Sequence, residues 1–445
     1  MTSEKIKSIH DGGIGFFWIN GERLQKTRRP SESGYIRLGD RNLIEVATLN
    51  ENPNGAGVDP PVPRSITAAT EHGGLILLSI ARHRGSLAFG GGHASVHRYW
   101  ARSLIAGVHP DDLRSDRVFE LKLLFPSVHR WAGLTAATER FQSDKDSRLA
   151  GYSVELSSPE GLTVQLSPTL QLTIAAHWSV TGPTDRRILY TPTSIACTST
   201  RPRPINDLRK VLSWVHGLLC LCHGGCVIAD GGTAVPDCEP NGMTPTYWDT
   251  RFMVCPRSAP EPELSLPFLQ LGTVGGVSAL ARWLRLCERH PRAVRPVIEP
   301  YAGVGRSASV RMLEVAAAIE YWINCHRRSA AWARKHSLKP LNLAESVGKH
   351  LATWVGDSKI WADLFWETYN GLKHEPGYSP DPDHVGVLAE SGALLLTTAL
   401  LDRIARNKMP AKVIFGDAHR TWQLRDAVQE LVSNPPKKMS RRSGP

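Results

Sequence analysis

The sequence has few of the features that define membrane, secreted or fibrous proteins. Its longest uncharged apolar run near the C-terminus, residues 391–401, is much shorter than the ~20 residues that a membrane-spanning helix needs. The first residues lead into no apolar segment of the kind found in secretory signals. Hydrophobic residues make up 41% and charged residues 21% of the 445 residues, which excludes a chain that is disordered throughout. We therefore expect a folded cytoplasmic protein of two or three domains with no membrane partner.

Cysteine is scarce, and eight cysteines in a chain of this length and expected compartment do not predict a disulfide framework. Cys220, Cys222 and Cys226 lie close to His223, a spacing at which a zinc site can be suspected. The residues before them recur at helical spacing, which predicts an amphipathic helix over 207–221 with Cys220 on its last turn. A second CxxC pair is missing. We therefore expect these cysteines to be core residues and predict neither a metal nor another cofactor.

Nucleotide-binding and hydrolase motifs are incomplete. Residues 90–93 (Gly-Gly-Gly-His) lack the GK[ST] of a phosphate-binding loop, and residues 303–305 (Gly-Val-Gly) lack the strand that precedes a dinucleotide fingerprint. The sequence contains no GxSxG nucleophile elbow. The two glycine-rich segments are therefore interpreted as loops.

Acidic residues are fewer than basic residues: the chain has 42 Asp and Glu and 53 Lys and Arg, which gives a formal net charge of +11. Four of the basic residues lie in the last nine positions. This balance favours polyanionic partners such as RNA, while a solvated basic surface without a partner is the alternative.

Hydrophobic periodicity changes along the chain and predicts an α+β protein. Segments 119–123, 162–166 and 170–174 alternate apolar and polar residues, as half-buried antiparallel strands do. We predict an N-terminal β-sandwich-like domain over residues 1–300, which includes the helix near 207–221. A Pro-rich stretch and its flank, roughly residues 256–306, are expected to contain the break between domains.

Helical periodicity dominates the C-terminal part. Apolar stripes over 312–323, 343–354, 360–368 and 387–404 predict an antiparallel bundle over residues 301–432. The last of these segments is apolar on nearly every face, as in a helix at the centre of a bundle. Residues 433–445 have no periodicity and are expected to form a basic, disordered tail.

The end of the third of these helices carries a polar group. Asn370 and His374 are one turn apart on one face, with Lys373 next to His374, and Glu375-Pro376-Gly377 end the helix. The helix dipole favours a protonated imidazole there. By spacing alone, a solvated helix end is the alternative to a functional site.

At this point the sequence resembles a known family. Asn-x-x-x-His at the end of a late bundle helix resembles the hallmark of HEPN domains, and residues 311–320 resemble their first helix, with an internal acidic residue at Glu320. The upstream part resembles the N-terminal domain of ApeA-type bacterial anti-phage proteins. The segments that carry this second resemblance are residues 103–109, the strand at 119–125, Trp131, Ile195 and the helix at 208–222.

The resemblance implies an abortive-infection ribonuclease that cleaves RNA by metal-independent acid–base catalysis. In that role His374 is the acid or base, and Asn370 positions the imidazole or the phosphate. Lys373 is the candidate electrostatic stabiliser, and Glu320 holds the cation or the imidazole.

One part of the family's motif is missing. The motif arginine would fall within residues 367–369, but residues 361–374 contain no arginine. Lys373 can replace its charge, although a lysine lacks the bidentate fork of a guanidinium. Arg327 and Arg328, after the first helix, are the predicted substrate-binding cations, and a partner subunit is a further source because family members pair their motifs across a dimer.

The predicted partners are RNA, with tRNA as one candidate, a phage-derived trigger bound by the N-terminal domain, and a second copy of the chain. A non-catalytic HEPN domain that binds nucleotide or RNA and dimerises remains the main alternative to an endoribonuclease. A third interpretation is a β-sandwich that recognises a phage protein or a carbohydrate, with a purely structural bundle.

Overall fold

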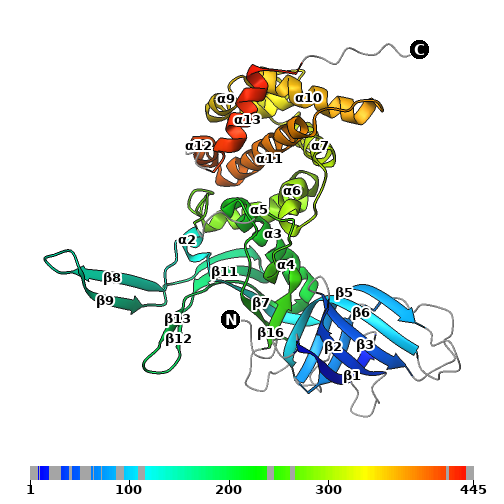
Figure 1. Cartoon of the computed structure of the whole chain (residues 1–445), viewed down its shortest axis with the longest axis vertical. Coiled ribbons are helices and arrows are strands. Elements are labelled where there is room, and N and C mark those ends of the chain that lie inside the picture. The colour runs from blue at the N-terminus through cyan, green and yellow to red at the C-terminus, as the bar shows by residue number, and fades with distance from the viewer. Residues whose placement is uncertain are drawn as a thin grey trace. The chain divides into compact units, whose positions relative to one another are not determined.

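The computed structural model describes the chain except for 1–8, 10, 20–31, 40–42, 51–61, 64, 72, 87–94, 109–115, 238–244, 261–265, 417–419 and 437–445. The glycine-rich segment at 90–93 and the basic end of the tail therefore lie outside the described residues. The chain packs into two compact units, which are treated separately below: residues 1–216 with 227–255, and residues 217–226 with 256–445 (Figure 1). The first unit is antiparallel β-structure and the second is helical, which confirms the predicted α+β class.

The division falls at residue 255, whereas the sequence predicted a β-rich domain that extends to residue 300. The difference comes from helices α5 (Val277–Arg289) and α6 (Pro291–Ile298), which pack with helices of the second unit. Both lie in the flank of the Pro-rich stretch, within the range of residues 256–306 that was expected to contain the break between domains. Pro291 begins α6, a position where the missing N–H of proline costs the helix nothing.

Twelve of the sixteen described strands, all in the first unit, form one continuous sheet. Its order is β10-β11-β14-β7-β15-β16-β6-β3-β2-β1-β4-β5, and β5 pairs again with β6. The bounds of these strands are β1 (Gly13–Ile19), β2 (Glu32–Leu38), β3 (Ile44–Asn50), β4 (Ser65–Thr70), β5 (Gly73–Ser86), β6 (Ser95–Val108), β7 (Arg117–Phe125), β10 (Leu162–Ser167), β11 (Leu170–Ala176), β14 (Thr193–Pro204), β15 (Gly231–Pro236) and β16 (Thr246–Asp249).

The pairing of β5 with β6 closes six strands into a barrel, so the β-structure is a barrel extended by an open sheet instead of two stacked sheets. Register shifts at Gly74/Leu75 and Ile80/Arg82 interrupt the β5–β6 ladder. Such irregularities increase local twist and bend strands, which closure requires. Phe17, Ile36 and Leu77 are among the residues of the buried core that these strands enclose.

Two hairpins extend from the sheet of the first unit as separate two-stranded ribbons (Figure 1). They are β8 (Ala137–Ser143) with β9 (Leu149–Leu156), and β12 (Ser179–Thr181) with β13 (Ile188–Tyr190).

Helix α3 (Ile205–His223) follows β14 and contains the predicted segment 207–221. Cys220, Cys222 and Cys226 are all buried, as the core interpretation expects.

The helices of the second unit form a bundle around α11 (Pro382–Ala405), which contacts α5, α6, α7, α8, α10, α12 and α13. The bounds of the remaining helices are α7 (Ala308–His326), α8 (Lys339–Val347), α9 (Lys349–Val355), α10 (Ser358–His374), α12 (Met409–Gly416) and α13 (Trp422–Ser433). The predicted stripe over 343–354 is divided between α8 and α9 at Gly348, whose φ of 102° is unfavourable for any other residue.

Helix α11 is long and apolar enough to cross a membrane by length and composition alone. Within the protein, however, 67% of its apolar window is buried. A helix that is apolar on every face has this burial when it lies at the centre of a bundle.

Candidate functional site

Helix α10 presents the predicted polar residues at its C-terminal end because its N-terminal part is fixed in the bundle core. The Asp357 side chain caps its start by accepting hydrogen bonds from the backbone N–H groups of residues 359 and 360. Trp361 is fully buried, and its indole N–H donates to the Ser391 hydroxyl at 3.0 Å. Phe365 packs against Gly392, where an added Cβ would lie 2.3 Å from the ring. The register of α10 on α11 is therefore strictly defined.

A connected polar cluster joins α10 to α7 and α8. The Glu320 carboxylate on α7 accepts hydrogen bonds from the Lys339 ammonium and, at 3.4 Å, from the Tyr369 hydroxyl. Lys373 in turn donates to the Tyr369 hydroxyl at 3.0 Å, and its ammonium lies 5.0 Å from the centre of the Tyr369 ring. Glu320, Tyr369, Lys373 and Lys339 thus form one network, which we call the Glu320 cluster.

The Glu320 cluster fixes the charge state of two predicted site residues. The hydrogen bond from Lys339 lowers the pKa of the Glu320 carboxyl, and the charges of Lys339 and Lys373 act in the same direction. The hydrogen bond to Tyr369 raises the pKa of the Lys373 ammonium, with a further contribution from Glu320. Both groups are therefore ionised at neutral pH, so the end of α10 carries a permanent cation on an exposed side chain.

Asn370 and His374 lie outside this hydrogen-bonded cluster. His374 is exposed and Asn370 half-buried, on the same face of α10 one turn apart. Within the described part of the chain neither side chain forms a hydrogen bond or ion pair. The structure therefore joins Glu320 and Lys373 as expected and leaves the amide and the imidazole accessible to a ligand.

Arg327 and Arg328 follow the last residue of α7 in an exposed turn. Arg327 is seven positions after Glu320, so the two residues project from the same side of the helix axis. The structure gives these arginines no contact with the Glu320 cluster.

Tyr369 and Lys339 are members of the cluster that sequence reasoning missed. Tyr369 occupies one of the positions where the motif arginine would fall, and it is only 4% exposed. The sequence feature that could have identified Tyr369 is its position directly before Asn370. Lys339 comes from another helix, and no pattern in the sequence places it beside Glu320.

Comparison with known proteins gives one match. The model of a family described as ApeA N-terminal domain 1 matches residues 14–283. This range contains all of the β-structure except the first residue of β1, together with α3 and the first half of α5, and it ends before the Glu320 cluster. No curated protein and no solved structure matches the chain.

Proposed function

The chain belongs to the ApeA N-terminal domain 1 family of bacterial anti-phage defence proteins, and from this we propose that its helical unit is a HEPN-type ribonuclease. The observation that carries the proposal is the end of α10, where an accessible imidazole and amide adjoin a fixed cation. We place the protein in the cytoplasm, where it meets both RNA and an infecting phage.

The proposed reaction needs no metal. A neutral imidazole of His374 takes the proton from a ribose 2′-hydroxyl, whose oxygen attacks the adjacent phosphorus. The new O2′–P bond replaces the P–O5′ bond, and an imidazolium returns a proton to the leaving 5′-oxygen. The products are a 2′,3′-cyclic phosphate and a 5′-hydroxyl, so atoms and charge balance.

Each remaining residue has a defined role in this scheme. Lys373 stabilises the negative charge that develops on the phosphate, and Tyr369 and Glu320 position Lys373. Asn370 orients the imidazole or a phosphate oxygen, and Arg327 and Arg328 contact RNA phosphates beyond the scissile bond. A second copy of the chain supplies the second imidazole, so that one histidine acts as base while the other acts as acid.

The proposal predicts that phage protection depends on His374. Cells that carry His374→Ala should lose protection, because the variant cannot transfer the proton, while the protein accumulates to the level of the wild type. His384→Ala is the matched control, since His384 is also an exposed histidine of this unit but lies on α11. Full protection by His374→Ala would instead support a non-catalytic HEPN module that binds RNA or nucleotide.

We further propose that the β8–β9 hairpin contacts the phage-derived trigger. Its two strands expose the rings of Phe141 and Tyr152, 65% and 53% accessible, with centroids 5.1 Å apart, and Leu149 is 66% exposed beside them. Aromatic side chains exposed together are typical anchors of protein interfaces.

Removal of these rings should therefore abolish recognition of the trigger without lowering the stability of the protein. The double variant Phe141→Ser/Tyr152→Ser is expected to retain the wild-type melting temperature, because neither ring belongs to the core, but to lose phage protection. Thr163→Ser, an exposed change on β10, is the control. Protection at the wild-type level in the double variant would exclude the hairpin as the trigger site.

A further inference from the structure

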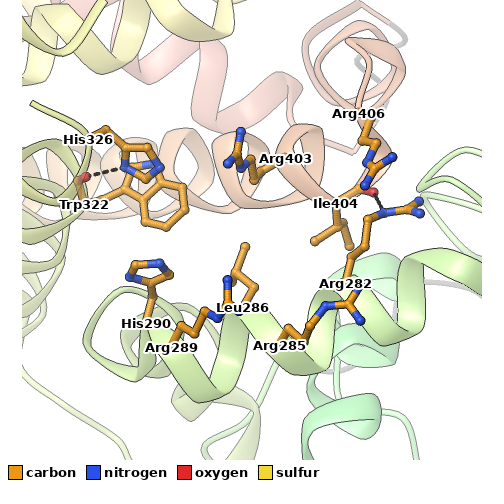
Figure 2. A pocket seen from close by; sticks show the side chains of 10 residues that line it. All are labelled: Arg282, Arg285, Leu286, Arg289, His290, Trp322, His326, Arg403, Ile404 and Arg406. Carbon is orange, nitrogen blue, oxygen red and sulfur yellow. Dashed lines mark hydrogen bonds between the residues drawn. The ribbon is translucent and has the colours of Figure 1, made fainter. Parts of the chain in front are cut away.

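A basic pocket lies in the helical unit, apart from the Glu320 cluster. It is a cavity of about 370 Å³ between α5, the end of α7 and the end of α11 (Figure 2). Glu320 and Trp322 are two positions apart on α7, roughly 200° around the helix axis, so Trp322 faces this pocket on the side opposite to Glu320. The lining residues include five arginines, two histidines and no acidic residue: Arg282, Arg285, Arg289, His290, His326, Arg403 and Arg406.

The arginines converge from two helices. Arg282, Arg285 and Arg289 follow the i, i+3, i+7 spacing and so share one face of α5. Arg403 lies in the last turn of α11 and Arg406 at its C-cap. Figure 2 places these two groups on opposite sides of the cavity. A cluster of like charges on two facing helices repels itself unless an anion lies between them.

Four of these guanidinium groups have no anionic partner among the described residues. Arg285, Arg289, Arg403 and Arg406 are exposed and form no ion pair with any described residue. Asp402 precedes Arg403 in the sequence, but its carboxylate already pairs with the Lys408 ammonium at 2.9 Å and accepts a hydrogen bond from the backbone N–H of Ala411. The pocket therefore keeps its positive charge in the described fold.

Two of the arginines, Arg282 and Arg406, help to hold the walls of the pocket in place. Arg282 donates to the carbonyl oxygens of Ile404 and Gly275 and to the Ser278 hydroxyl, which holds the end of α11 against α5. Arg406 has a φ of 60°, a conformation that is uncommon for a residue with a side chain and that directs the chain out of α11 at this point. The site is thus preorganised by the bundle and does not need a ligand to form.

Two histidines, His290 and His326, line the other end of the pocket. His326 Nδ1 lies 2.8 Å from the carbonyl oxygen of Trp322; a carbonyl only accepts, so this nitrogen is the donor and the contact fixes the orientation of the ring. Burial lowers the pKa of His290, and the neighbouring His326, Arg289 and Arg403 lower it further. The same positive potential that opposes protonation of His290 attracts an anion.

We propose that this pocket binds a small polyphosphate, either the phosphate chain of a nucleoside triphosphate or an inorganic polyphosphate. Arginine forks bind phosphate oxygens bidentately, and four of them around one cavity match several neighbouring phosphates better than a single one. The cavity volume lies in the range of small-molecule pockets, which favours a compact ligand over the extended backbone of an RNA strand.

Isothermal titration of the full-length chain with ATP, tripolyphosphate and AMP tests the proposal. ATP and tripolyphosphate should bind one per chain, and AMP at least tenfold more weakly. Arg285→Gln and Arg403→Gln, both at exposed positions, should each weaken binding by about tenfold and together by about a hundredfold, since each removes one charge-assisted contact. Arg186→Gln, an exposed arginine of the β-unit, should leave affinity unchanged.

The outcomes separate the possible ligands. Equal binding of ATP and tripolyphosphate assigns recognition to the phosphate chain, and tighter binding of ATP assigns part of it to the nucleoside; both support the proposal. It is overturned if neither compound binds at 1 mM, about −4 kcal/mol, or if the double variant binds as tightly as the wild type. A parallel titration with single-stranded RNA separates the remaining case: the proposal is also overturned if only the RNA binds and Arg285→Gln and Arg403→Gln weaken that binding. His374→Ala should bind polyphosphate normally, so this test is independent of the proposed ribonuclease.

Discussion

Purified His374→Ala protein is expected to cleave RNA about 10²–10⁴-fold more slowly than the wild type, the range that general acid–base catalysis contributes. The imidazole is exposed at the end of α10 and forms no hydrogen bond or ion pair within the described residues, so its loss should leave the melting temperature unchanged. Initial cleavage rates in excess EDTA and a thermal melt of the same preparations provide the two readouts. His384→Ala should match the wild type in both.

An unchanged rate in His374→Ala would contradict the assignment of this residue as acid or base. Lys373→Gln gives a complementary result, because it removes the charge stabiliser and retains the imidazole, and it should slow cleavage by about 10²–10³-fold. If neither variant affects cleavage, the end of α10 is not the catalytic site, and a binding and dimerisation role for the bundle takes its place.

A second large effect is expected in the β-unit, where Asp249→Ala should lower the free energy of unfolding by about 3–5 kcal/mol. Asp249 is fully buried and accepts hydrogen bonds from the Tyr247 hydroxyl at 2.7 Å and the Arg251 backbone N–H at 2.9 Å. It also faces the Arg209 guanidinium of α3 at 3.8 Å. Its removal would take away the carboxylate that faces the largely buried Arg209 guanidinium and accepts a hydrogen bond from the buried Tyr247 hydroxyl.

For a unit of this size the loss corresponds to a melting temperature lower by about 6–20 °C. The exposed change Asp185→Ala should have no comparable effect. The double variant Arg209→Met/Asp249→Ala should lose less stability than the sum of the single variants, because it removes both facing charges together. Strict additivity would show that Arg209 and Asp249 do not interact energetically.

The elements that the sequence predicts well are those whose periodicity is set by one buried face. The strand expected over 119–123 lies within β7, and the stripe over 312–323 lies within α7. Both patterns are local, so neighbouring residues are sufficient to identify them. Helix α5 was missed because its segment was included in the range expected to contain the break between domains, although its arginines at i, i+3 and i+7 follow a helical spacing.

Features that depend on distant residues could not be predicted in this way. Closure of the barrel requires β5 to pair with both β4 and β6, a choice that single-strand alternation does not contain. The link between Glu320 and Lys373 runs through the buried Tyr369 and depends on how α10 crosses α7. The basic pocket needs the end of α11 to meet α5, two segments more than a hundred residues apart.

The central claim is that the end of α10 cleaves RNA without a metal, and analysis of the cleavage products tests it most directly. The purified full-length protein would be incubated with RNA in EDTA and the new termini identified by mass spectrometry. We expect cleavage with 2′,3′-cyclic phosphate and 5′-hydroxyl ends, formed about 10²–10⁴-fold more slowly by His374→Ala. Cleavage that requires Mg²⁺ and leaves 3′-hydroxyl and 5′-phosphate ends would contradict it.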